Sequence, residues 1–194
     1  MRHSYVIAII VAVLSIASVS QAQDLMWIDD STAIPGAHAE AIVRLNNQLH
    51  IQGFQSAISW DSNIFSHVSE DTSGLDIEIL LAPHEVEFFT STYDDNFEPG
   101  IGWAACAAIF DFSPPFSGQT LAPGTENSIV RFTLQVVADN ALIGSCSDVS
   151  PVNGMGQPVI HNILTIDGIS TMPELLAGTV CFVDAVAFIR GDGN

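Results

Sequence analysis

The chain has 194 residues, a length that favours one domain, and it carries 22 Asp and Glu against 4 Lys and Arg, for a formal net charge of −18. Such a surface repels phosphate backbones and argues against a nucleic-acid partner. An excess of acidic residues is typical of an exported protein that is kept soluble by a solvated acidic surface.

Residues 1–22 have the features of a secretory signal peptide. Arg2 and His3 give a short positive start, residues 6–17 form an apolar run, and small residues occupy the −3 and −1 positions before Gln23. A membrane anchor is the alternative, but the run is short for spanning a bilayer. No later stretch is long and apolar enough to cross a membrane. We therefore expect a secreted or cell-surface protein with no membrane span after signal removal.

The remaining chain consists of short alternating segments bounded by Gly, Pro, Asn or Asp, which predicts about nine strands. Residues 93–100 are expected to form a polar loop. Residues 103–112 (WAACAAIFDF) could form a helix because alanine favours helix, but Pro114 and Pro115 follow almost directly, and the strand is preferred. The expected strand segments, in chain order, are 24–30, 39–45, 51–60, 65–68, 75–81, 85–90, 103–112, 128–137, 141–146, 159–166 and 179–183.

The segment 51–60 has one apolar face. Phe54, Ile58 and Trp60 share one parity of the strand, so they must lie against a second apolar layer. The other segments can supply that layer, most clearly 128–137, where apolar and polar residues alternate throughout. The fold class predicted is therefore all-β: a two-sheet antiparallel β-sandwich of the jelly-roll type, spanning residues 23–184.

The three cysteines, Cys106, Cys146 and Cys181, are an odd number. An oxidising compartment permits one disulfide and one free thiol, and the sequence leaves the pairing open. Cys106 lies among alanines, where it can pack as a small buried hydrophobe. The absence of a CxxC motif argues against a zinc site.

No catalytic motif is present, because HExxH, GxSxG and the phosphate-binding GxxxxGK[ST] are all missing. The histidines are scattered without the spacing of metal ligands. Asp94, Asp95 and Glu98 could form a calcium site or an acid/base pair, although a solvated acidic loop is preferred. The chain is therefore not expected to be an enzyme.

Three aromatic residues could form a platform for sugar stacking if they are exposed: Tyr93, Trp103 and Phe116. Core packing is the preferred interpretation for Trp103. At the end of the chain, residues 188–194 read FIRGDGN. Asp192 and Asn194 are spaced like the first and third ligands of a calcium loop, which makes calcium the one cofactor to consider.

This FxRGDxN pattern resembles the start of the dockerin-type calcium repeats found in exported bacterial proteins, notably those of Planctomycetes. The expected dockerin-like segment, residues 185–194, is truncated before the remaining ligands. The preceding body resembles the cohesin family, which belongs to the carbohydrate-binding-module-like β-sandwiches. Four segments carry this second resemblance: Pro-Gly at 34–36 with the strand and Asn that follow it, the strand and Asp turn at 51–61, the long strand at 127–137, and the closing G-x-V at 178–180.

The resemblance implies a non-catalytic recognition module, because cohesins bind dockerins through one sheet face and assemble extracellular polysaccharide-degrading complexes. By analogy, the binding residues would be Gln55, Ala57 and Ser59, together with Trp103 on the strand at 103–112. The expected partner is a protein of the dockerin type or a polysaccharide. One alternative is a carbohydrate-binding module that uses aromatic stacking. The least favoured alternative is a glycoside hydrolase fragment, which would need two carboxylates facing a cleft.

Overall fold

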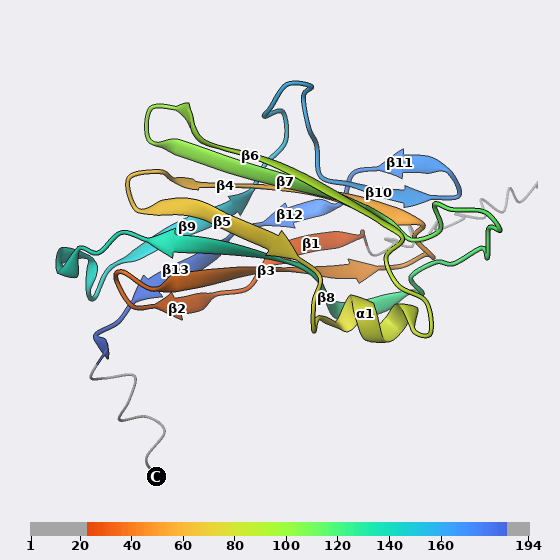
Figure 1. Cartoon of the computed structure of the whole chain (residues 1–194), viewed down its shortest axis with the longest axis horizontal. Helices are drawn as coiled ribbons and strands as arrows, with labels where there is room; N and C mark the ends of the chain where they lie inside the picture. Colours follow the sequence, from red (N-terminus) through yellow and green to blue (C-terminus); the bar gives the residue numbers. More distant parts are fainter. Residues whose placement is uncertain (1–22, 186–194) are drawn as a thin grey trace, which may run out of the picture.

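The computed structural model describes residues 23–185, and these form two β-sheets packed face to face (Figure 1). The predicted signal peptide and the calcium-loop residues Asp192 and Asn194 lie outside the described residues. The elements are β1 (Leu25–Ile28), β2 (Ser31–Ala33), β3 (His38–Asn47), β4 (Gly53–Asp61), β5 (Phe65–Asp71), α1 (Asp76–Leu81), β6 (Phe88–Glu98), β7 (Ile101–Ile109), β8 (Gly124–Val136), η1 (Asn140–Leu142), β9 (Cys146–Pro151), β10 (Ile163–Ile166), β11 (Ile169–Thr171), β12 (Glu174–Leu176) and β13 (Gly178–Phe182).

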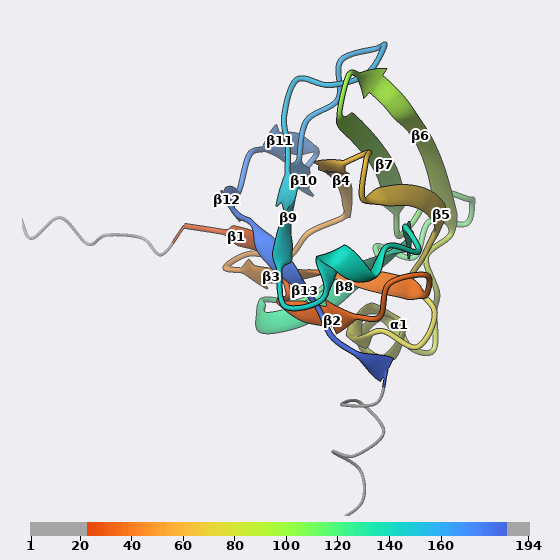
Figure 2. The same ribbon diagram turned by 90° about the vertical axis from the view of Figure 1, so that its left-hand side faces the viewer.

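The first sheet has the strand order β12-β1-β3-β8-β5. The second sheet has the order β11-β10-β4-β9-β13-β2, with β7 on the other edge of β4 and β6 next to β7. Figure 2 shows β4, β6 and β7 as one layer above β1, β3 and β8. Most pairs are antiparallel, but β1 pairs with β12 and β2 pairs with β13 in parallel. The predicted two-sheet antiparallel sandwich is confirmed.

The core lies between the sheets and follows the predicted alternation. Phe54, Ile58 and Trp60 of β4 are buried in the same cluster as Phe132 and Leu134 of β8. Full burial of each such side chain contributes about 1.5–3 kcal/mol. The described residues contain thirteen strands rather than about nine. The strands β2, β11 and β12 fall in segments too brief to show a period, and β9 was not expected at residues 146–151.

Residues 75–81, expected as a strand, contain the helix α1. Leu75, Ile77 and Leu81 are buried, whereas Ile79 is 73% exposed. In a strand, Ile79 would lie on the same face as Ile77 and Leu81 and would be buried with them. In a helix Ile77 and Leu81 are four residues apart and share one face, which is the face that packs on the core.

The expected polar loop at 93–100 is also wrong, because the strand β6 extends to Glu98 and forms a long hairpin with β7. Its residues are largely exposed on both faces, so no apolar alternation marks it. The strand expected at 141–146 is wrong as well. Asp139 accepts a hydrogen bond from the Ala141 N–H and begins the 3₁₀ helix η1, and β9 starts only at Cys146.

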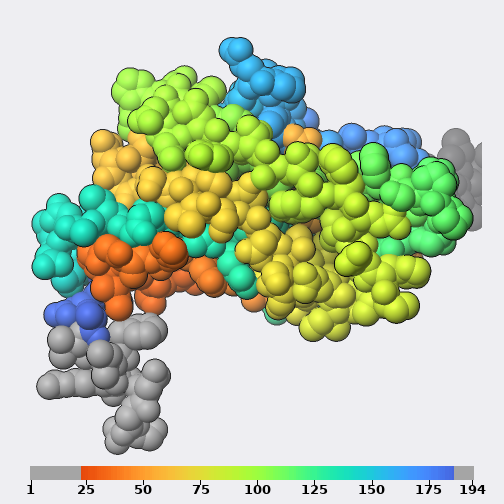
Figure 3. Space-filling view, in the orientation of Figure 1, coloured from red at the N-terminus to blue at the C-terminus, as the bar shows by residue number. Residues whose placement is uncertain are grey.

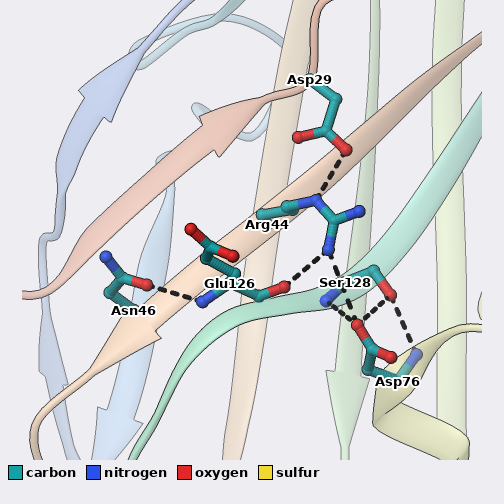
Figure 4. Close-up of polar contacts among 6 residues, drawn as sticks. All are labelled: Asp29, Arg44, Asn46, Asp76, Glu126 and Ser128. Carbon is teal, nitrogen blue, oxygen red and sulfur yellow. Dashed lines mark hydrogen bonds and ion pairs between the residues drawn. The ribbon is translucent and has the colours of Figure 1, made fainter.

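A polar network holds α1 against the first sheet (Figure 4). The Ser128 N–H and hydroxyl both donate to Asp76 Oδ2, at 3.0 and 2.8 Å, and Ser128 Oγ accepts from the Asp76 N–H at 2.9 Å. Arg44 Nη1 lies 3.6 Å from the same carboxylate oxygen, and Arg44 Nε donates to Asp29 at 2.6 Å. The network therefore joins β3, β8, α1 and the turn that follows β1.

Acid is expected to weaken this junction. The Ser128 N–H, the Ser128 hydroxyl and the Arg44 charge hold the pKa of Asp76 below its usual value. Asp76 therefore contributes stability that is fully present above the pKa of an unfolded Asp, about 3.9, and is lost as the pH falls through the lower folded pKa. Urea unfolding at pH 7 to 3 should show a stability difference between the wild type and Asp76→Asn that shrinks toward pH 3. Glu174→Gln is the exposed control, and a difference for Asp76→Asn that stays constant with pH would contradict this role.

Candidate functional site

The outer face of the second sheet carries the residues that the sequence predicted as a binding site. Strand pairing places three rows of outward side chains across β4, β7 and β6. In two of these rows the middle residue, on β7, is an alanine. Because alanine has a small side chain, the surface is lower along β7 than along β4 and β6. We call this surface the outer face, and its rows are Gln55–Ala107–Thr90, Ala57–Ala105–Thr92 and Ser59–Trp103–Asp94.

The loop of residues 152–162, between β9 and β10, forms one wall of this surface. In Figure 1 it rises above the sheet beside β6 and β7, and Figure 2 places it next to β6 as well. A cavity of about 310 Å³ lies between this wall, lined by residues 158–160, and the β6 residues Thr90 and Thr92. Gln55, Ala105 and Ala107 line its floor. The outer face is therefore a shallow groove with a polar strand on one side and an apolar loop on the other.

The buried side chain of Asn162 fixes this wall. One edge of β4 pairs with β10 at residues 53–55 and with β9 at residues 58–60, which leaves the backbone of Ala57 between them. Asn162 Oδ1 accepts from the Ala57 N–H at 2.9 Å, and its Nδ2 donates to the carbonyls of Ala57 and Val152 at 3.1 and 2.7 Å. The amide thus replaces a missing stretch of strand. It gives the Ala57 N–H and the Val152 carbonyl their partners, while the Ala57 carbonyl also accepts from the Val152 N–H at 2.9 Å.

A small second hydrophobic cluster packs the loop onto the sheet. Trp103 is buried, and Phe97 contacts it edge-on with ring centroids 6.0 Å apart. Gly156 has φ +85°, and a Cβ at this position would lie 2.7 Å from Cη2 of Trp103. Only glycine combines this backbone conformation with such close approach to the indole. The wall is therefore part of the folded core and is already in place before any partner arrives.

The predicted site residues lie together, as their parity required, but they are not equally accessible. Ala57 and Trp103 are buried under the 152–162 loop, while Gln55 and Ser59 are half-buried. Thr90 and Thr92 were missed because their strand was read partly as a loop. The wall residues 158–160 were missed because residues 159–166 were expected to form one strand, whereas β10 begins only at Ile163.

The three aromatic residues weighed as a sugar platform do not share a surface. Trp103 is buried, and Tyr93 stacks on His67 from the other side of β6, with ring centroids 4.0 Å apart. His67 also pairs with the buried carboxylate of Glu70. Burial raises the pKa of Glu70, but hydrogen bonds from His67 and Ser91 outweigh it and leave the pKa below its usual value. Phe116 is exposed elsewhere on the molecule.

The acidic residues of the β6–β7 hairpin bind backbone groups. Asp94 Oδ1 accepts from the Asn96 N–H at 2.9 Å, and Asp95 Oδ1 accepts from the His67 N–H at 2.7 Å. Among residues 23–185, no group of three or more His, Cys, Asp or Glu side chains could hold a metal ion. In the same part of the chain the helices α1 and η1 have six and three residues, too short to cross a membrane.

The disulfide, left open by the sequence, joins Cys146 on β9 to Cys181 on β13, which face each other across the strand pair. Cys106 is free and buried on β7. Burial raises the pKa of the Cys106 thiol far above its usual value, so the group stays protonated and unreactive at neutral pH.

No protein-family model and no curated protein matches this sequence. Solved structures do match the fold. A cohesin from a type I cohesin–dockerin complex of Clostridium thermocellum has 17% identity and a TM-score of 0.59, over 84% of this chain and 100% of that one. The third cohesin of ScaC from Acetivibrio cellulolyticus, solved with a dockerin, has 12% identity and a TM-score of 0.59, over 83% and 99%.

A non-cellulosomal cohesin from the archaeon Archaeoglobus fulgidus is similar over 89% of this chain and 100% of its own, with 11% identity and a TM-score of 0.53. Each of these cohesins is thus matched over nearly its whole length. At such low identity the similarity concerns the fold rather than the binding residues. The described residues therefore form a cohesin-like two-sheet β-sandwich.

Proposed function

We propose that this protein is a non-catalytic recognition module that binds a protein partner through the outer face of its second sheet. The observation that carries the proposal is the preformed groove between Thr90–Thr92 and the anchored 152–162 loop. The similarity to cohesins, two of them solved with dockerins, supports a partner of that kind.

The geometry suits docking of a folded surface. The strands and the anchored wall are rigid before binding, so little conformational entropy is lost on association. The alanine floor lets a partner approach the sheet closely, while Gln55 and the two threonines offer hydrogen bonds that fix its register. A stable interface needs about 800 Å² from each partner, so the contact would extend from the groove over β4, β6 and β7.

An extracellular setting is part of the proposal. The Cys146–Cys181 disulfide supports an oxidising compartment, in agreement with the signal-peptide features of residues 1–22. A role in polysaccharide degradation or cell-surface assembly follows from the cohesin resemblance. The arginines of the described part lie on the first sheet and pair with carboxylates there, so the outer face has no arginine to attract nucleic acid.

The test uses two matched substitutions on opposite sheets. The full-length chain should retain a partner from the secreted proteins of its source, and Thr90→Arg should weaken that complex about 100-fold, since a large charge would fill the groove. Thr133→Arg, at a half-buried position of β8 in the first sheet, should leave affinity unchanged. Calorimetry with the purified partner measures both. Loss of binding in Thr133→Arg with full binding in Thr90→Arg would place the interface on the other sheet.

A further inference from the structure

A second cavity, also of about 310 Å³, lies beyond the groove where β4 begins and β7 ends. Gly53 and Ile109, which pair across these strands, form its base, and the loop of residues 110–119 borders it. This loop forms the right-hand end of the molecule in Figures 1 and 3. Gln52, Asp111, Gln119 and Thr165 line the cavity with polar side chains, and we call it the Asp111 cavity.

Two carboxylates hold the loop in shape. Asp111 accepts hydrogen bonds from the N–H groups of Ser117 and Gly118 at 3.0 and 2.6 Å. Glu87 accepts from the N–H groups at the start of the loop, residues 112 and 113, at 2.8 and 2.6 Å. The border of the cavity is thus built by specific contacts between side chains and backbone.

Gln119 has a buried oxygen atom with no partner. The residue is 9% exposed, and its Nε2 donates to the Glu85 carbonyl at 3.0 Å. Its Oε1 accepts no hydrogen bond within residues 23–185. An unsatisfied buried acceptor costs about 1–3 kcal/mol. Because this oxygen is closed to solvent, the Gln119 side chain must turn before a donor in the cavity can reach it and relieve this cost.

The lining defines the chemistry of the ligand. Asp111 presents carboxylate acceptors, whereas the Thr165 hydroxyl and the Gln52 amide can donate. No arginine or histidine lines the cavity, and the chain as a whole is strongly acidic, so an anion is repelled. A neutral polyhydroxylated molecule fits this set, since each hydroxyl both donates and accepts.

Aromatic rings lie on the same loop. Phe116 is 69% exposed, and Phe112 is 51% exposed and packs on Phe88 with ring centroids 4.9 Å apart. An exposed ring beside a polar pocket can cover the apolar face of a sugar ring. We propose that the Asp111 cavity binds a residue of a neutral saccharide, held by Asp111, Gln119 and Gln52 and covered by Phe116. This site is separate from the groove and does not depend on the proposed protein partner.

The test is calorimetric titration of the full-length chain with neutral hexasaccharides of glucose, xylose, mannose and galactose, and with an oligogalacturonate as the anionic probe. At least one neutral probe should bind, and the anionic probe should not. Phe116→Ala and Gln119→Leu should each weaken binding about tenfold or more, the loss expected from about 1.4 kcal/mol. Because Phe116 is exposed, its variant keeps the test valid if Gln119→Leu does not fold.

Two controls separate this site from the groove. Tyr93→Ala removes an exposed aromatic ring on β6, and Thr90→Arg fills the groove, so both should bind the sugar with unchanged affinity. The proposal is overturned if none of the neutral probes binds, if the oligogalacturonate binds as well, or if Phe116→Ala retains full affinity.

Discussion

Asn162→Ala is expected to lower the free energy of unfolding by about 3 kcal/mol. The substitution removes the amide that pairs with the N–H and the carbonyl of Ala57, a residue with no solvent exposure. The Ala57 N–H is left without a partner, whereas the Ala57 carbonyl keeps its bond from the Val152 N–H. Each buried backbone group left without a partner costs about 1–3 kcal/mol. The carbonyl of Val152 loses its donor too. The same change frees the wall of the groove, so partner affinity should fall together with stability.

Urea unfolding of the two proteins measures the loss. Asn63→Ala is the matched control, because among residues 23–185 the Asn63 amide bonds only to Asp61, and it lies at an exposed turn. A loss below about 1 kcal/mol is expected there, the range of an ordinary exposed hydrogen bond. Equal losses in the two variants would show that the amide of Asn162 does not replace a strand.

The double variant Cys146→Ala/Cys181→Ala is expected to be less stable than the wild type by about 4 kcal/mol. The disulfide closes a loop between residues 35 positions apart, and chain-entropy estimates for such a loop give this value. It also fixes β13 against β9, and β13 in turn holds the short strand β2. The free energy of unfolding in urea, measured at neutral pH, gives the difference.

A reductant distinguishes the disulfide from simple packing. Reduced wild type should unfold like the double variant, and the double variant should not respond to the reductant. Cys106→Ala is the control, since that thiol is free, and it should lose about 1 kcal/mol while keeping its sensitivity to reduction. A wild type whose stability is unchanged after complete reduction would contradict this assignment.

The alternation of apolar residues predicted the long strands β3, β4 and β8 because each of them buries one face. In β8, Val130, Phe132 and Leu134 are all buried, and the polar residues between them point outward. The two-sheet fold followed from several segments of this kind. The parity of β4 also placed Gln55 and Ser59 on the outward side, which is where the groove lies.

What the sequence could not show depends on contacts between distant residues. The pairing of Cys146 with Cys181 follows from the register of β9 and β13, and no local pattern records that register. Asn162 meets Ala57 across 105 positions of sequence, and Gly156 meets Trp103 only when the loop folds back. The short elements α1 and η1 were missed because tertiary packing and one capping side chain decide them.

The parallel pairing of early and late strands determines how the sandwich would respond to tension. β1 and β2 run in the same direction as their partners β12 and β13. Opposing forces applied before β1 and after β13 would therefore act along the paired strands, in shear, and load the bonds of each ladder together. A cell-surface module with this arrangement would resist being pulled open far better than one whose terminal strands could be unzipped bond by bond.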